Sequence, residues 1–201
     1  MLSGVVDTLE RAGARVAEAR PCSLRDAERL AQRLIQAVFS AAYPAEEYER
    51  LRVLAETAAV DDDSPSVRHA RNVTVRSRDL SIALEARAQL GARCATFFTE
   101  FDVLLCPITP TTAIPHDQQP DVDARRIIVN GMSRPYGDQI PWASLPGACG
   151  LPAVVLPAGL ARDGLPVGLQ VIGPFLTDRT VIGVVGYIGE LVGGFMSPSR
   201  Y

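Results

Sequence analysis

The chain has 201 residues, of which 47% are hydrophobic and 21% charged, and its formal net charge is -3. A globular chain of this length buries about 70% of the surface that it exposes when unfolded, so it needs no metal or disulfide to hold a core. The small negative charge gives no long-range attraction for phosphates, which argues against nucleic acid or a membrane surface as a partner.

The first hundred residues predict a mainly helical half. Ser3 is placed to cap a helix that runs to Ala12 and ends at Gly13, and residues 14–19 predict a short strand. Ser23 then opens a second helix, whose apolar residues recur at three- and four-residue spacing and form a stripe that packs onto the core. The stripe consists of Leu24, Ala27, Leu30, Ala31, Leu34, Ile35 and Val38.

Two more helices are expected before the sheet begins. One runs from Ala45 to about Thr57, and the acidic stretch 61–63 followed by Pro65 ends regular structure there in a surface loop. A long helical pattern returns from Ser77 to Phe101. Its expected inner side carries Leu80, Leu84, Ala88, Cys94, Phe97 and Phe98.

The second half alternates short apolar strands with helices. The segments 102–106, 153–156 and 167–172 have the length of core strands and are bounded by Pro or Gly, and helices are expected at 140–149 and 178–192. The sequence therefore predicts an α/β fold with a mixed sheet flanked by helices. We expect a single domain over 1–201, mainly helical up to residue 100 and a strand and helix core beyond it.

The last of these helices contains the longest apolar run of the chain. Val181–Met196 is 16 residues long and includes Glu190, which is short of the roughly 20 residues that a membrane span needs. We interpret it as a buried helix. Glycines at 183, 186 and 189 recur every third residue, and they would let this helix approach a neighbour very closely.

All 20 basic side chains of the chain are arginines. An arginine cannot release its proton near neutral pH, so Schiff-base chemistry, a P-loop and a lysine general base cannot be complete within this sequence. The sequence also has no G-x-S-x-G elbow and no glycine-rich phosphate motif. These classes of enzyme are thereby excluded for the chain on its own.

The remaining reactive residues predict no metal or cofactor. The pair His116–Asp117 would need further ligands, and only His69 is left to supply another imidazole. The cysteines form no C-x-x-C pair and are expected to be reduced buried thiols, although a Cys149 nucleophile stays open as an alternative. Met1–Arg15 lacks the features of a signal peptide, so a cytoplasmic protein is expected. The cysteines are Cys22, Cys94, Cys106 and Cys149.

Four blocks in order resemble the C-terminal part of the amidase signature family. They are DVLLCPITP at 102–110, RIIVNGMSRPYGDQIPW at 126–142, GLPAVVLPAG at 150–159 and DGLPVGLQVIG at 163–173. The resemblance implies a mixed sheet flanked by helices and the hydrolysis of carboxamides. It also implies a serine nucleophile that a lysine activates through a second serine, with backbone N–H groups holding the oxyanion.

This sequence contains neither a lysine nor a Ser-Ser dipeptide. The resemblance therefore leads us to expect the C-terminal portion of an amide hydrolase, which is inactive alone and meets its small-molecule amide only together with a missing N-terminal part. The alternative is a non-catalytic domain that binds or completes a partner protein. A homo-oligomer is left open.

The resemblance assigns no catalytic residue to this chain, but it implies positions at the substrate cleft. The segment with Tyr136, Asp138, Gln139 and Trp142 resembles the mouth of that cleft, and core packing of the two aromatic residues stays an equal alternative. For Asp138, the cap of a helix near Ile140 is the favoured interpretation. The structural positions of the motifs are Pro107, Gly150, Pro152, Gly164, Pro166, Gly168 and Gln170.

Overall fold

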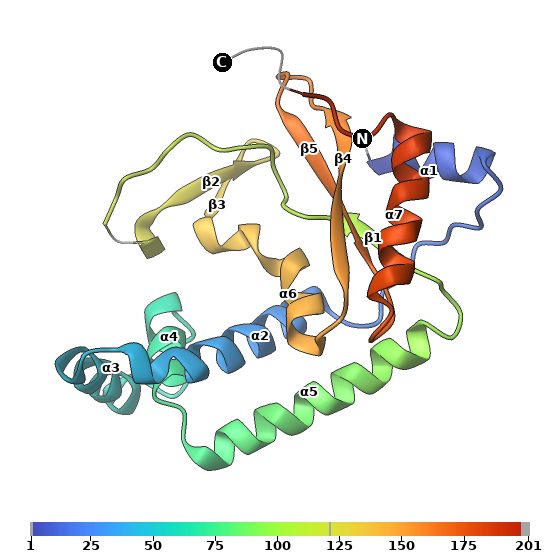
Figure 1. The fold of residues 1–201 in the computed structure, drawn as a ribbon. Coiled ribbons are helices and arrows are strands. Elements are labelled where there is room, and N and C mark those ends of the chain that lie inside the picture. Colours follow the sequence, from blue (N-terminus) through green and yellow to red (C-terminus); the bar gives the residue numbers. More distant parts are fainter. Residues whose placement is uncertain (1, 121, 198–201) are drawn as a thin grey trace.

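The computed structural model of the chain describes residues 2–120 and 122–197 (Figure 1). The first half is helical, as expected, and its long helix ends four residues earlier than the sequence pattern indicates. The helices of this half are α1 (Leu2–Arg11), α2 (Leu24–Phe39), the short 3-10 turn η1 (Ser40–Ala42), α3 (Ala45–Thr57), α4 (Pro65–Val73) and α5 (Ser77–Phe97).

The second half contains a three-stranded sheet and a separate hairpin. The sheet has the order β1-β5-β4 and every pair in it is antiparallel, so the expected helix-flanked α/β sheet is confirmed while its pairing within the described residues is not mixed. The elements are β1 (Leu104–Pro107), η2 (Val122–Ala124), β2 (Arg126–Val129), β3 (Met132–Pro135), η3 (Tyr136–Gln139), α6 (Pro141–Cys149), β4 (Ala153–Leu160), β5 (Pro166–Ile172) and α7 (Asp178–Val192).

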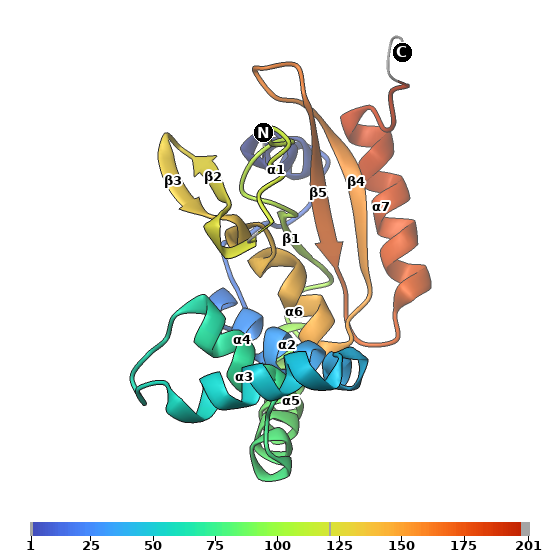
Figure 2. The same ribbon diagram turned by 90° about the vertical axis from the view of Figure 1, so that its left-hand side faces the viewer.

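Strand β5 is the centre of the fold because both of its faces are covered. Side chains alternate between the two faces of a strand. Leu169 and Val171 pack in the cluster that includes α1 and α7, whereas Ile172 packs in the cluster that includes α2, α5 and α6. Figure 2 shows α7 on one side of the β4–β5 pair and α6 on the other.

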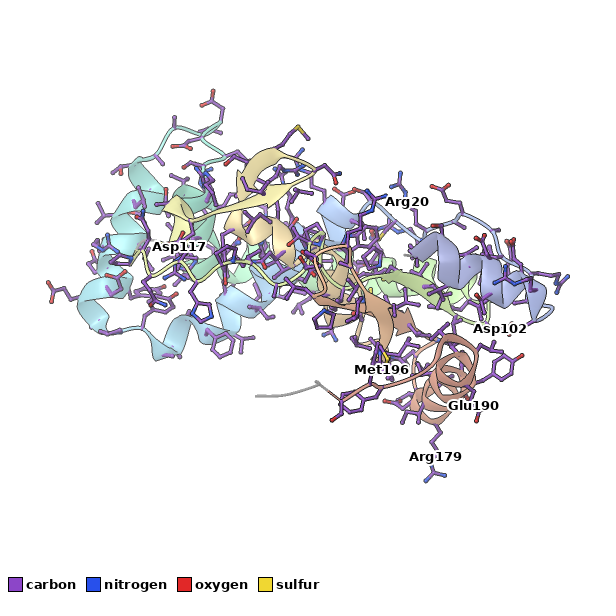
Figure 3. The ribbon with its side chains drawn as sticks, turned by 90° about the horizontal axis from the view of Figure 1, so that it is seen from above. Arg20, Asp102, Asp117, Arg179, Glu190 and Met196 are labelled. Atoms are coloured by element: carbon purple, nitrogen blue, oxygen red, sulfur yellow. The ribbon has the colours of Figure 1, made fainter. Side chains whose placement is uncertain are left out.

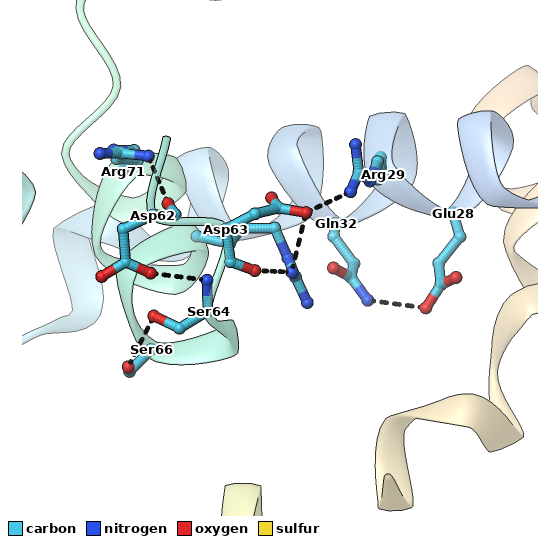
Figure 4. A network of polar contacts seen from close by, with 9 residues as sticks. Glu28, Arg29, Gln32, Asp62, Asp63, Ser64, Ser66 and Arg71 are labelled. Atoms are coloured by element: carbon cyan, nitrogen blue, oxygen red, sulfur yellow. Dashed lines mark hydrogen bonds and ion pairs between the residues drawn. The ribbon is translucent and has the colours of Figure 1, made fainter. Parts of the chain in front are cut away.

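The outer helices α3 and α4 form a small cluster of their own, which a polar network ties to α2. Arg29 of α2 contacts the Asp63 carboxylate at 2.5 Å, and Arg71 of α4 donates to the backbone carbonyl of Asp62 (Figure 4). Arg71 also donates to the backbone carbonyl of Ala59. The expected surface loop at 61–64 is present. Pro65, however, is the first residue of α4 rather than the end of regular structure, because a proline at this position needs no hydrogen-bond acceptor for its nitrogen.

Two expectations for the N-terminal segment are wrong. Residues 14–19 lie within the described part of the chain and form no strand there. Five of the six are exposed and none belongs to a sheet pair. Ser3 does not cap α1 but lies inside it, since the helix already begins at Leu2.

The β2–β3 hairpin was not anticipated from the sequence pattern. Asn130 and Gly131 connect the two strands, and both have positive φ angles of 52° and 77°. An Asn-Gly pair with this conformation matches the right-handed twist of the flanking strands. The Asn-Gly dipeptide between RIIV and MSRP was the available signal.

Helices α2 and α5 bury narrower faces than the apolar pattern indicates. On α2, Ile35 and Val38 are 57% and 77% exposed. On α5, Leu84 and Ala88 are exposed. The buried residues are Ala83, Leu90 and Cys94, of which Cys94 was expected. Periodicity identifies the apolar residues of a helix but not how many of them a neighbouring element covers.

Helix α7 is half covered rather than buried, which corrects the interpretation of its apolar run. Only Val181 and Ile188 of the helix are buried, and Arg179 extends away from the rest of the molecule (Figure 3). A Cβ added at Gly183, Gly186 or Gly189 would meet nothing within 4 Å in the described structure. None of the described helices combines the length and the apolar character that crossing a membrane would take.

The close approach of α7 to the sheet occurs at Gly173 instead. This buried residue follows β5 directly, and a Cβ there would overlap the Cγ2 atom of Val181, which is 0% exposed. The Thr177 hydroxyl would lie 3.1 Å from the same Cβ. A side chain at this position therefore forces α7 away from β5.

We expect Gly173→Ala to lower the free energy of unfolding by about 1–3 kcal/mol, because an overpacked core must shift its backbone. Gly183→Ala is the matched control on the open side of α7. It should raise the free energy of unfolding by about 0.5–1 kcal/mol, since alanine is the better helix former. Urea denaturation followed by circular dichroism measures both. Destabilisation by both variants would contradict this assignment of the close contact.

Candidate functional site

A hollow of about 240 Å³ lies where β1 ends and β5 begins. Gln139 of η3 borders it as well, so three parts of the second half meet there. Its lining consists of Pro107, Ile108, Thr109, Thr111, Thr112, Ala113, Gln139, Pro166, Val167 and Gly168. This volume is below the range of about 300–1,000 Å³ that is typical of ligand pockets, so the hollow suits a small group rather than a large ligand.

The lining is apolar apart from threonine hydroxyls and one amide. The hydroxyls of Thr109 and Thr111 donate to the carbonyl oxygens of Thr111 and Thr112 at 2.8 and 2.6 Å, and Thr112 donates to the Asp163 carboxylate at 3.2 Å. Their protons are thereby engaged, while hydroxyl oxygen lone pairs can still accept. The Gln139 amide nitrogen donates to the Tyr136 carbonyl at 3.3 Å, which leaves its oxygen as a further acceptor.

The described lining residues include no charged side chain and no Ser, Cys or His. The threonine hydroxyls donate to carbonyl oxygens and to the Asp163 carboxylate, and none of them is paired with an imidazole or amine base within this set. The hollow can therefore bind a neutral polar group without an activated nucleophile. Its acceptor oxygens match the N–H groups of an uncharged carboxamide. Elsewhere in the described residues, no group of three or more His, Cys, Asp or Glu is arranged to hold a metal ion.

Several motif residues named from the sequence converge on this hollow. Pro107 ends β1, Pro166 begins β5, and Gly168 lies two residues further along β5. A Cβ at Gly168 would come within 2.9 Å of the Val155 Cγ1 atom on β4. The threonines were not singled out, although they directly follow the strand end at Pro107, where loop side chains commonly form sites.

Of the four residues named for the mouth of the cleft, Gln139 lines the hollow, whereas the other three do not. Tyr136 lies under the Arg125 guanidinium at 5.8 Å from its ring centre, and Trp142 packs against the core cluster of α2, α5 and α6. Asp138 pairs with Arg134 at 2.6 Å. The expectation that it caps a helix is wrong, because Ile140 occupies the cap position of α6 and no side chain bonds there.

Other motif glycines and prolines shape the backbone around the sheet. Gly150 has a φ of 67° and closes α6 in the left-handed conformation. The Pro152 carbonyl accepts a hydrogen bond from the Gly173 amide at 3.0 Å. Gly164, with a φ of 79°, lies in the turn that joins β4 to β5.

Gln170 is a buried polar residue of β5, two positions beyond Gly168. The residue is only 3% exposed. Its side-chain amide nitrogen donates to the Trp142 carbonyl at 3.1 Å and to the Cys106 sulfur at 3.3 Å. These bonds join β5 to α6 and to β1. Burial raises the pKa of the Cys106 thiol, which therefore stays protonated beside this amide.

The structure does not favour Cys149 as a nucleophile. Within the described residues its sulfur contacts that of Cys94 at 3.7 Å, whereas His69 lies beside the Tyr43 hydroxyl and His116 is exposed. The contact with Cys94 and burial both raise the pKa of Cys149. A cysteine nucleophile needs the opposite shift.

The helix-flanked sheet is shared with known proteins. The sequence profile of the Amidase family matches residues 1–182, and the chain belongs to that family. A crystal structure of an amidase superposes with a TM-score of 0.69 at 21% identity, over 96% of this chain and 41% of that one. A bacterial aryl acylamidase of the amidase signature enzymes gives 0.66 at 20% identity, over 94% and 39%.

Curated relatives give a closer sequence match over a shorter part. One of them, a subunit of the glutamyl-tRNA(Gln) amidotransferase from Exiguobacterium sp., is 32% identical over 116 residues, which are 58% of this chain and 22% of that protein. The matching region thus spans about a fifth of the length of this relative. The resemblance to the amidase signature family stated from the motifs is confirmed.

We expect Gln170→Leu to lower the free energy of unfolding by about 1–3 kcal/mol, because the Trp142 carbonyl loses its donor in a buried setting. Gln89→Leu is the control, since Gln89 donates to Glu85 on the exposed side of α5 and should change stability by less than about 0.5 kcal/mol. Chemical denaturation gives both values. Equal effects in the two variants would show that the buried amide has no special role.

Proposed function

We propose that this chain forms the C-terminal part of an amide-hydrolysing enzyme and that its hollow receives part of a carboxamide substrate. The observation that carries the proposal is the convergence of the motif residues Pro107, Gln139, Pro166 and Gly168 on one hollow. These positions come from three of the four sequence blocks that resemble amidases. Membership of the Amidase family supports the reaction class.

The lining favours an uncharged amide over an acid or an amine. A carboxylate would meet the hydroxyl and amide oxygens without a cation to balance it, and an ammonium would lack a carboxylate in the lining. The solved relatives include an aryl acylamidase and a 6-aminohexanoate cyclic dimer hydrolase. Both names denote amide cleavage, and they leave the particular amide open.

We further propose that the nucleophile and base come from outside these 201 residues. The sequence has only arginine as a basic side chain other than histidine, and the described lining residues contain no Ser, Cys, Lys or His. Without the nucleophile and the base of a serine triad, an enzyme loses roughly a millionfold in rate. The chain alone should therefore bind an amide weakly and not hydrolyse it.

The test combines binding with turnover. In a titration of the isotopically labelled chain with benzamide, the backbone amide resonances of 108, 109, 111–113, 139, 167 and 168 should shift, and benzoate at the same concentration should leave them in place. Gln139→Leu should raise the Kd for benzamide about 3- to 10-fold, because one acceptor is lost. Gln118→Leu, an exposed residue outside the lining, should leave it unchanged.

Turnover is followed with benzamide and an anilide as substrates. The purified chain should release ammonia or aniline no faster than buffer does. Any hydrolysis by the purified chain above the rate in buffer would overturn the proposed external nucleophile, and serine-to-alanine substitutions would then show whether a serine of the chain supplies it. Shifts spread evenly over the molecule, or equal shifts with benzoate, would overturn the hollow as an amide site.

A second candidate function is a non-catalytic domain that binds the remainder of an amidase fold. In the described part of the chain no strand pairs with the outer edge of β4, and Val155 and Leu160 on this strand are 50% and 55% exposed. Open apolar strand edges promote association. The amidase neighbours are more than twice as long as the region they share with this chain, and their remaining part is the occupant that we propose.

We expect the isolated chain to self-associate and to bind a hydrophobic dye through the β4 edge. Val155→Lys should reduce both, because a lysine on an edge strand opposes pairing. Val60→Lys is the control, since Val60 is 96% exposed in a loop of the helical half. Light scattering after size-exclusion chromatography measures the effect, and a monodisperse wild-type monomer without dye binding would count against this candidate.

A further inference from the structure

We propose that Cys94 and Cys149 form a redox-active dithiol, which a hydroperoxide converts to a disulfide that links α5 to α6. Cys94 lies near the end of α5 and Cys149 is the last residue of α6. Their sulfur atoms are 3.7 Å apart although 55 positions separate them in the sequence. This pair lies away from the hollow, since neither residue belongs to its lining.

The backbone around Cys149 is held in place, so the sulfur contact is built into the fold. The Arg87 guanidinium on α5 donates to the Ala148 carbonyl at 3.0 Å, and Gly150 closes α6 in the left-handed conformation. The side chains of Leu90 and Leu145 are buried in the same cluster as Cys94. The two helices therefore keep the sulfurs together without a covalent bond.

The environment of the pair favours one thiolate. A thiolate at Cys94 accepts a hydrogen bond from the Cys149 thiol, which lowers the pKa of Cys94, and the charge of Arg93 lowers it further, against the effect of burial. Thiolates are the species that react with peroxides and disulfides. Cys94 itself is buried and Cys149 is partly exposed, so a small oxidant reaches the Cys94 thiolate from the side of Cys149.

The other two thiols are worse placed. Cys106 is buried on β1 and accepts the hydrogen bond of Gln170. Cys22 lies beside the same core cluster, and burial together with Cys94 raises its pKa. The contact between Cys94 and Cys149 therefore selects this pair.

The reaction balances with hydrogen peroxide as the oxidant. The Cys94 sulfur attacks the peroxide as a thiolate and forms a sulfenic acid with release of hydroxide. The Cys149 sulfur then attacks the Cys94 sulfenic acid, so that the S–S bond forms and a second hydroxide leaves. The two protons of the original thiols convert these hydroxides to water, so two thiols are oxidised and one peroxide is reduced to two waters.

The bond would close a long loop between α5 and α6, and it would restrict the unfolded chain more than the folded one. We expect the oxidised chain to melt about 5–10 °C higher than the reduced chain. The gain should disappear when a reductant such as dithiothreitol is added.

The experiment treats the purified, reduced chain with hydrogen peroxide and measures its intact mass and a non-reducing peptide map. The expected product has lost two hydrogen atoms, keeps two free thiols and contains the peptides of Cys94 and Cys149 joined together. Cys22→Ser should still form this product. Cys94→Ser and Cys149→Ser should not, and circular dichroism shows whether each variant is folded.

Three outcomes would overturn the proposal. They are a chain whose sulfurs gain oxygen without losing hydrogen, a disulfide that includes Cys22 or Cys106, and a disulfide between two molecules only. Phenylarsine oxide, which binds paired thiols, gives a second readout that does not depend on oxidation. It should bind the wild-type chain and Cys22→Ser, and it should fail to bind Cys149→Ser.

Discussion

The Gln170 amide lies where the central strand β5, the edge strand β1 and helix α6 meet, and the rest of the second half depends on its hydrogen bonds. Because it donates to the Trp142 carbonyl and to the Cys106 sulfur, α6 cannot move relative to the sheet without leaving a buried polar group unpaired. Such a group costs about 1–3 kcal/mol. Helix α6 follows η3 directly, so the same bonds fix Gln139 beside the start of β5. A structural bond thereby defines the shape of the hollow.

One face of strand β4 is covered by helices, whereas its opposite face is partly exposed to solvent. Leu156 and Val171 face α1 and α7 in a closed apolar cluster, whereas Val155 on the opposite face of β4 is half exposed. The hollow lies along this less covered region, since its Gly168 is the residue that Val155 approaches. A site with so open a wall binds a ligand firmly only when another element covers it, because burial of the ligand supplies most of the binding energy. In our two candidate functions, binding of an amide in the hollow is therefore coupled to association of the chain with a partner.

Apolar runs and turn residues in the sequence predicted those helices and strands that depend on interactions between neighbouring residues. The strand near Ala153 and the helix at 178–192 were located from their apolar runs and flanking glycines and prolines, and the motifs identified the family. Contacts between distant segments could not be predicted in the same way. The pattern of Gly183 indicated a close helix contact, but that contact occurs at Gly173, because the geometry of the strand end brings Val181 there. The exposure of Ile35 likewise depends on which elements surround α2, and the hollow depends on threonines that no motif distinguished.

The chemistry of the hollow and the composition of the chain support the same proposal, in which this chain binds the amide and another part supplies the nucleophile and the base. An amide is cleaved only when a base accepts a proton from the nucleophile, and a guanidinium cannot be that base. The lining offers acceptor oxygens without charge, which orient an N–H group but do not attack a carbonyl. Orientation alone lowers the barrier only for a partner that carries the reacting groups. In the function that we propose, a second surface brings the nucleophile to the open side of β4, next to the hollow.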